Sequence, residues 1–246
     1  MLTSLTIQAQ SVVIADSFKD GERFSQELPN SAFWQTATPD AVSVEDQSIR
    51  FTRSNYGVRH IAAKITSAKD PIQLQIGEGL NVSFEFTPDS IETFDINCLR
   101  IGLFNVEGEG LFDGYNDSYS ALGFAAILRS DLGQIRILER NNVSVPLISS
   151  LRPNAYPITL GSDAAQLGIQ LVAGKRYQVS FEINRTSDSV LSFTASISDG
   201  TTTNAITTAY EAGEISSFDL LVIGLSSSVP SATIDNIILT RKKFDI

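Results

Sequence analysis

Apolar and polar residues alternate along much of the chain, and this period of two is typical of strands with one buried face. The alternation is uninterrupted over residues 80–87 and 177–184, and it continues over residues 191–198. β-Branched and aromatic residues fill many of the apolar positions, as a pleated and half-buried surface favours. The pattern therefore predicts strands that each turn one face towards a core.

Further strand candidates have a similar composition and are separated by turn signals such as Asp199-Gly200. They cover residues 11–16, 48–53, 58–65, 96–104, 120–129, 134–139, 218–225 and 233–241. Many short strands with polar outer faces predict an all-β fold, a two-sheet antiparallel β-sandwich of the jelly-roll type.

The first ten residues differ from the rest of the chain. Residues 1–10 (MLTSLTIQAQ) lack a basic segment, but a short apolar stretch is followed by small residues. This segment is either the remnant of a secretory signal, or a frayed N-terminus or first edge strand. The first alternative predicts a secreted or cell-surface protein. No linker rich in Pro, Gly or Ser interrupts residues 11–246, which we expect to form a single domain.

One tetrapeptide, Val-Ser-Phe-Glu, occurs twice, at residues 82–85 and 179–182. Each copy lies within one of the alternating segments. Either the same half-buried environment selects the same residues, or one half of a sandwich arose by duplication.

Composition narrows the classes of partner. The chain has 246 residues, 42% of them hydrophobic, which is enough for a substantial core. Its net charge of −10 argues against nucleic acid or an anionic membrane as the main partner. No stretch approaches the ~18 apolar residues of a membrane span. The single cysteine, Cys98, and the single histidine, His60, exclude an intrachain disulfide and a multi-histidine metal centre.

Several segments resemble the concanavalin A-like lectin/glucanase superfamily, which includes laminin-G-like jelly rolls. Residues 174–181 (GKRYQVSF), the strand at 190–197 and the Asp199-Gly200 turn are similar to one of its hairpins. Residues 14–18 (IADSF) and 234–239 (IDNIIL) resemble its paired first and last strands. The resemblance implies a concanavalin A-like jelly roll, an architecture shared by lectins, carbohydrate-binding modules, glycoside hydrolases and polysaccharide lyases.

Hydrolysis is not favoured by the residues. A hydrolase of this superfamily carries an E-x-D-x-(x)-E strand, and retaining chemistry needs two carboxyl groups about 5–5.5 Å apart. The nearest match joins Glu92 to Asp95, and acids three positions apart fall on opposite faces of a strand. The sequence therefore favours a protein that does not cleave its ligand.

A polysaccharide lyase is the main alternative within this resemblance. Such an enzyme needs a His or Tyr base and an Arg that neutralises a uronate carboxylate. His60, Arg59 and Arg100 supply these residue types, but Val58 stands where alginate-lyase-like enzymes have the Gln of Gln-x-His. A lyase or hydrolase with an atypical catalytic set therefore stays open as an alternative.

Sugar binding needs exposed aromatic rings beside polar side chains. Trp34 lies in a polar, loop-like stretch and is either a stacking platform or a plug over the sandwich edge. We predict a non-catalytic, lectin-like domain that binds a polysaccharide or oligosaccharide. The candidate carbohydrate-binding residues are Trp34, Arg59, His60, Arg100, Tyr115, Asn116 and Tyr119.

A structural calcium ion is a further expectation from the resemblance, because in this superfamily a calcium site often ties the first strand to the last. Asp235 would then supply a side-chain ligand, with Asp16 and Asp20 in the regions that supply the others. The alternative is that Asp235 and Asn236 cap backbone groups at a strand bend. A calcium-stabilised structural or adhesion domain is therefore the third functional reading.

Overall fold

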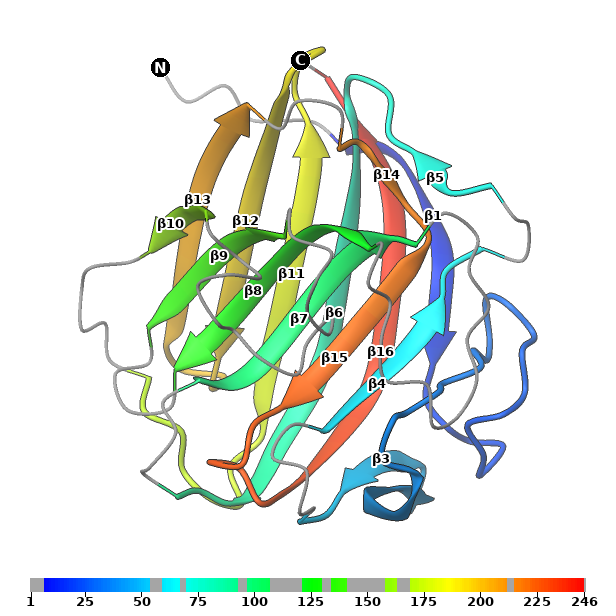
Figure 1. The fold of residues 1–246 in the computed structure, drawn as a ribbon, viewed down its shortest axis with the longest axis vertical. Helices are drawn as coiled ribbons and strands as arrows, with labels where there is room; N and C mark the ends of the chain where they lie inside the picture. Colours follow the sequence, from blue (N-terminus) through cyan, green and yellow to red (C-terminus); the bar gives the residue numbers. More distant parts are fainter. Residues whose placement is uncertain are drawn as a thin grey trace.

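Two antiparallel β-sheets are stacked face to face in the computed structural model, which describes residues 7–53, 59–66, 70–92, 97–106, 121–129, 134–140, 158–162, 169–211 and 215–245 (Figure 1). The eight-stranded sheet contains, in spatial order, β13 (Thr203–Glu211), β12 (Val190–Ser198), β11 (Tyr177–Arg185), β6 (Glu78–Ser90), β16 (Ser231–Phe244), β3 (Ser48–Phe51) and β2 (Val42–Glu45), with β1 (Ile7–Asp16) also paired to β16. The six-stranded sheet contains β10 (Ile158–Ser162), β9 (Ile135–Arg140), β8 (Leu122–Arg129), β7 (Asn97–Asn105), β15 (Leu220–Leu225) and β4 (Arg59–Lys64).

Two small elements complete the described part of the chain. A two-stranded sheet joins β5 (Ile72–Gln73) to β14 (Ser217–Phe218), and a 3-10 turn, η1, spans Pro39–Ala41. Within the described residues no helix is long and apolar enough to cross a membrane.

The β-sandwich predicted from the alternation is confirmed. The first and last strands pair as the resemblance implied, with Ile14 opposite Leu239 and Asp16 opposite Ile237. Residues 7–10, at the start of the chain, belong to β1. The sequence missed β13, which follows β12 through the Asp199-Gly200 turn, where Gly200 has a φ of +86°.

The core fills the space between the two sheets. Inward positions of β6 and β11 carry fully buried side chains, among them Val82, Phe84 and Phe181. Across the gap, the Phe124 ring of the six-stranded sheet lies 4.7 Å from the Phe193 ring of the eight-stranded sheet, measured between centroids. Tilted aromatic pairs of this kind add about 0.5–1.5 kcal/mol to the gain from burial.

The two Val-Ser-Phe-Glu segments lie side by side on β6 and β11. Val82 is opposite Phe181, and Ser83 is opposite Ser180, in one continuous antiparallel register. Each valine and phenylalanine is buried in the core, whereas each serine lies on the outward face. The two copies therefore share one environment, which accounts for their identical residues.

Candidate functional site

The outward face of the six-stranded sheet carries side chains in rows that cross the strands. Residues such as Ile61 of β4 and Ile223 of β15 belong to the core, so the alternate positions point away from it. Gly224 of β15 lies opposite both His60 of β4 and Arg100 of β7. Because directly opposed residues share a face, His60 and Arg100 flank a position that has no side chain.

The same row continues into the next two strands. Ile127 of β8 lies opposite Arg100 on one side and opposite Arg136 of β9 on the other. Arg129 follows Ile127 on the same face of β8. We call Arg100, Arg129 and Arg136 the arginine cluster. Arg100 is buried, whereas Arg129 and Arg136 are half-buried.

Gln134 holds two members of the arginine cluster together. Its Oε1 accepts a hydrogen bond from Arg129 Nη1 at 3.2 Å and another from Arg136 Nε at 3.3 Å. Its main-chain carbonyl accepts the Arg129 amide at 2.8 Å, which places the two residues opposite each other at the start of the β8–β9 hairpin. Two guanidinium groups thus converge on one neutral oxygen.

The centre of this face is apolar. A neighbouring row of buried side chains forms a hydrophobic cluster separate from the main core, with Ala62, Val222, Ala125 and Leu138 among its members. Gly102 lies in this row, and a Cβ added there would come within 2.1 Å of the Phe104 ring. The side chains in the middle of the face are therefore buried and apolar. The half-buried polar side chains of the face, Arg129, Gln134 and Arg136, lie on one side of it, at the β8–β9 hairpin.

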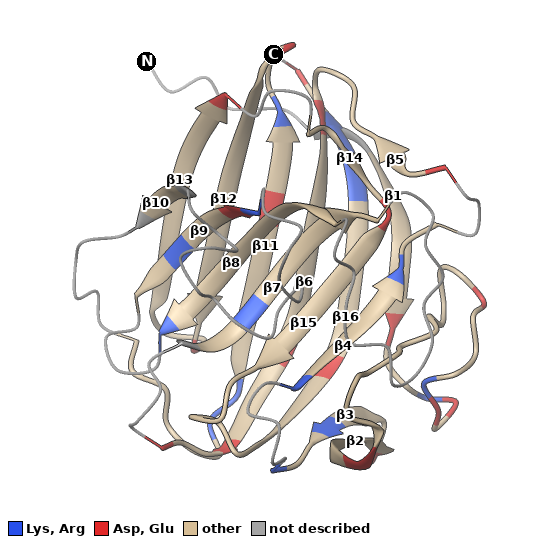
Figure 2. Ribbon diagram, in the orientation of Figure 1, with Lys and Arg blue, Asp and Glu red and all other residues tan. Residues whose placement is uncertain are grey.

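Charge is distributed unevenly between the two sheets (Figure 2). The six strands of the smaller sheet contain six of the 18 Lys and Arg residues but a single acidic residue, Glu139. On the outward face, every charged side chain of these strands is basic. The protein as a whole carries a charge of −10, so this face is positive in an acidic molecule.

Arg59 precedes His60 in the sequence but serves the backbone of neighbouring loops. Its guanidinium donates hydrogen bonds to the main-chain oxygens of Thr52 (2.7 Å), Pro230 (2.5 Å), Ser226 (2.8 Å) and Val229. The side chain is buried, and this burial, followed by the nearby charge of Arg53, lowers the Arg59 pKa to about 10. Arg59 is therefore a cationic anchor for residues 226–230 and does not share the position of His60 and Arg100.

Trp34 is fully buried, with 0% of its surface exposed, so neither face of the indole is open to a sugar. Its Nε1 donates to Asp16 Oδ2 at 2.9 Å, and its ring contacts that of Phe18. This placement matches the alternative of a plug at the sandwich edge.

Similar folds occur among solved structures. Peanut lectin, solved with a 9mer peptide, is 12% identical, with a TM-score of 0.54 over 97% of this chain and 100% of that chain. The endo-1,3-beta-glucanase from Streptomyces sioyaensis is 13% identical, with a TM-score of 0.55 over 98% and 99%. The exoplasmic/lumenal domain of VIP36 in a Ca²⁺/Man-bound form is 10% identical, with a TM-score of 0.56 over 93% and 88%.

The protein has the concanavalin A-like lectin/glucanase fold. No protein-family model and no curated protein matches its sequence. The concanavalin A-like fold agrees with the hairpin and terminal strands that the sequence resemblance identified.

The carboxylates predicted to bind calcium accept hydrogen bonds from within the protein. Asp16 accepts N–H groups of Phe18 (2.9 Å) and Ala32 (3.0 Å) as well as the Trp34 indole, so both of its oxygens face donors. The two oxygens of Asp20 accept from Glu22 N (3.2 Å) and Ser31 Oγ (3.0 Å). Among the described residues no three His, Cys, Asp or Glu side chains gather where they could hold a metal ion.

Asp235 has the role that the capping alternative described. Its oxygens accept the backbone N–H of Asn236 at 2.6 Å and that side chain's Nδ2 at 3.3 Å. Asn236 has a φ of +51° and lies where the β6–β16 register shifts. Burial, with the negative charges of Glu85 and Asp16, raises the Asp235 pKa. Asp235 therefore stabilises a bulge in β16.

Three of the predicted carbohydrate-binding residues, Tyr115, Asn116 and Tyr119, lie outside the described residues. Sequence reasoning missed Arg129, Gln134 and Arg136, although a signal was present. Arg129 ends one strand candidate (residues 120–129) and Arg136 lies near the start of the next (residues 134–139), so a hairpin between the two segments would bring the arginines close together.

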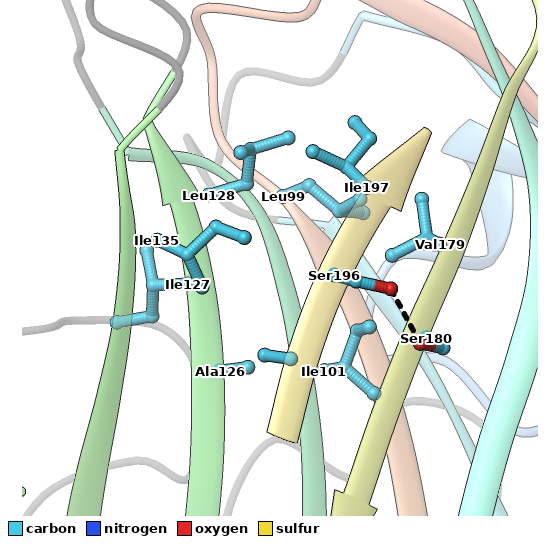
Figure 3. Close-up of a pocket in the computed structure, with 11 residues that line it drawn as sticks. Leu99, Ile101, Ala126, Ile127, Leu128, Ile135, Val179, Ser180, Ser196 and Ile197 are labelled. Atoms are coloured by element: carbon cyan, nitrogen blue, oxygen red, sulfur yellow. Dashed lines mark hydrogen bonds between the residues drawn. The ribbon is translucent and has the colours of Figure 1, made fainter. Parts of the chain in front are cut away.

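An apolar cavity of about 20 Å³ lies between the sheets (Figure 3). Ile101, Ala126 and Leu128 of the six-stranded sheet line it together with Val179 and Ile197 of the other sheet. The cavity is too small for a sugar ring, and its walls are mostly apolar, with Ser180 and Ser196 hydrogen-bonded to each other at its edge, so we interpret it as a packing gap.

Ala126→Val is expected to fill this gap and to raise the free energy of unfolding by about 1 kcal/mol, because added methyl groups regain contacts. Chemical denaturation measures the change. Ala63→Val is a matched control, since Ala63 is fully buried in the same sheet but does not line the cavity. Overpacking should make that variant less stable by about 1–3 kcal/mol. Equal destabilisation of both variants would contradict the assignment of a gap.

Proposed function

We propose that the protein binds a polysaccharide or oligosaccharide at the outward face of its six-stranded sheet and does not cleave it. The observation that carries this proposal is the pair of half-buried arginines, Arg129 and Arg136, that converge on Gln134 at one side of this face, in a fold shared with lectins. Guanidinium and imidazole groups donate several hydrogen bonds, and sugar hydroxyl and ring oxygens accept them. Convergent donors on a rigid sheet supply the orientation that a carbohydrate site needs.

The charge of this face supports binding without hydrolysis. Glycosidases place two carboxyl groups at the scissile bond, one as acid and one as nucleophile or base. The outward charged side chains of the described six-stranded sheet are basic, and Glu139 lies on the inward side, where its hydrogen bond with Tyr210 raises the pKa of that tyrosine. The face is therefore built to donate hydrogen bonds.

Aromatic stacking is assigned to Tyr115 and Tyr119, which the sequence analysis names as candidates. Tyr115 and Tyr119 would stack on sugar rings, and Asn116 would add hydrogen bonds. Trp34 takes no part, since it is buried. The proposed setting is the cell exterior or the cell surface, where polysaccharides are met.

One observation favours a lyase as the second candidate. His60 and Arg100 flank Gly224, so a residue of the base type and a cation of the type that neutralises a carboxylate lie on either side of a position without a side chain, although all three residues are buried. Elimination would leave an unsaturated sugar at the new chain end, which absorbs ultraviolet light.

Titration calorimetry against a panel of neutral and acidic polysaccharides tests the proposal. We expect binding that Tyr115→Ala weakens at least about tenfold, or about 1.4 kcal/mol, through loss of stacking. Phe24→Ala is the control, because Phe24 is an exposed aromatic residue that belongs to no strand of this sheet, and it should leave the affinity unchanged. Absence of binding across the panel would overturn the proposal, and unsaturated or shortened products would replace it with the lyase or a hydrolase.

A further inference from the structure

We propose that a groove at one end of the eight-stranded sheet binds a small phosphate or sulfate ester. The groove lies where β1 and β6 begin and β16 ends, and its volume is about 300 Å³. Sites for small molecules begin at roughly this size. The residues that line it are Gln10, Ser11, Glu78, Arg241, Lys242 and Lys243. This inference goes beyond the proposed function, because it assigns a second ligand to the other sheet.

Three consecutive basic residues of β16 line the groove, and the blue segment near the end of β16 in Figure 2 marks them. Arg241 and Lys243 share one face of the strand, in register with Leu80 and Glu78 of β6. Glu78 is buried and contacts both cations. Its Oε2 accepts Arg241 Nη2 at 2.5 Å, and its Oε1 lies 3.3 Å from Lys243 Nζ. One carboxylate therefore holds two positive charges close together and balances one of them.

A third cation lies beside the same carboxylate. Arg185 of β11 is opposite Glu78, and its guanidinium donates to main-chain oxygens of residues 74, 187 and 188, which carry no full charge. Burial raises the pKa of Glu78, but hydrogen bonds from Arg241, the Gln75 amide and Lys243 lower it overall, so Glu78 is ionised at neutral pH. Three cations around one carboxylate leave an excess of positive charge in a protein whose net charge is −10.

The cations of the groove differ in how far their charge is available. Lys242 is on the opposite face of β16, where its Nζ lies 2.6 Å from Glu182 Oε1, so its charge is balanced. The side chains of Arg241 and Lys243 are 35% and 65% exposed. Both therefore reach solvent while Glu78, beneath them, fixes their position. A ligand that enters the groove meets Arg241 and Lys243 first.

The other groups of the groove favour an oxyanion. Gln10 and Ser11 of β1 are exposed and add an amide and a hydroxyl, which donate hydrogen bonds to oxygen. A phosphate group on an ester has three acceptor oxygens and a charge of about −1.5 to −2. Charge-assisted hydrogen bonds from guanidinium and ammonium groups to such oxygens are stronger than those between neutral groups. The remaining volume of the groove would hold the organic part of the ester.

Nuclear magnetic resonance titrations with glucose 6-phosphate, glucose 6-sulfate, inorganic phosphate and glucose test the inference. We expect an ester to bind with a Kd of about 1 mM or below, to shift amide signals of residues 10–11, 78–79 and 241–243, and to bind more weakly as salt rises. Glucose should not bind at this groove. Lys243→Gln should weaken binding at least about fivefold, whereas Lys243→Arg should retain it. The melting temperature of each variant reports its folding.

Lys175→Gln is the matched control, because Lys175 is also an exposed lysine paired with a carboxylate, Asp199 at 2.6 Å, but does not line the groove. It should leave the affinity unchanged. The two ester arms tell phosphate from sulfate recognition. Absence of binding, or tighter binding of inorganic phosphate than of either ester, would overturn this inference and leave the proposed function intact. Equal weakening by Lys175→Gln and Lys243→Gln would also overturn it, since it would reduce the effect to overall charge.

Discussion

Arg59→Met is expected to lower the free energy of unfolding by about 4 kcal/mol. The guanidinium of Arg59 donates to four main-chain oxygens from residues 52, 226, 229 and 230, and the side chain is 1% exposed. Methionine fills a similar volume but leaves those buried acceptors without a donor, at about 1–3 kcal/mol for each that water does not reach. Urea denaturation followed by circular dichroism measures the loss.

Two variants sharpen this prediction. Arg59→Lys keeps the positive charge, but its single ammonium group cannot reach all the oxygens that the planar guanidinium reaches. The stability of this variant should therefore lie between those of the wild type and Arg59→Met. Arg53→Met removes an exposed arginine that pairs with Glu92, and it should change stability by less than about 0.5 kcal/mol. If Arg59→Met kept full stability and lost carbohydrate binding, Arg59 would be a ligand-binding residue and the anchor role would be wrong.

Asp16→Ala is expected to lower the free energy of unfolding by about 3–4 kcal/mol. The carboxylate of Asp16 accepts the N–H groups of Phe18, Ala32 and Trp34 and is 2% exposed, so it fixes the segment between β1 and Trp34. Alanine would leave three buried N–H donors without an acceptor. Asp16→Asn retains one acceptor oxygen and should be less damaging. Thermal and chemical unfolding of the three proteins measure this order.

Asp20→Ala is the control for this set, since the Asp20 side chain is exposed and its hydrogen bonds are to Glu22 and Ser31. We expect Asp20→Ala to lower the free energy of unfolding by less than about 1 kcal/mol. The calcium alternative makes a different prediction: the melting temperature of the wild type falls on addition of a chelator, and Asp16→Asn abolishes that response. That outcome would show Asp16 to be a metal ligand.

The fold could be predicted from the sequence because apolar side chains on alternate residues favour sheets with one buried face, and the resemblance of the hairpin and terminal strands pointed to the sandwich. β6, β11 and β12 show this pattern without error, and each forms a long strand. β13 was missed because its inward positions mix Asn204, Ile206, Thr208 and Tyr210, which blurs the alternation. Pairing with β12 decides its structure.

The roles of the charged residues were harder to predict from the sequence. The sequence shows that Arg59 and Asp16 carry groups that could bind a sugar or a metal ion. It does not show that both side chains are buried and hydrogen-bonded to distant main-chain groups, which for Arg59 lie up to 171 positions away. The row of His60 and Arg100 depends on β15, which enters the sheet between β4 and β7 from much later in the chain. Arg129 and Arg136 are a local pair across one turn, so a predicted hairpin would have placed them close together, but residues 122–129 are apolar on both faces and do not show which face carries Arg129.

The most direct measurement of the central claim is a nuclear magnetic resonance titration of the isotope-labelled protein with the oligosaccharide that binds best. The account predicts shifted signals for the side chains of Arg129, Arg136 and His60 and for backbone amides of β7, β8 and β9, with those of β12 and β13 unchanged. Shifts confined to the eight-stranded sheet would contradict the assignment of the six-stranded face as the carbohydrate-binding surface.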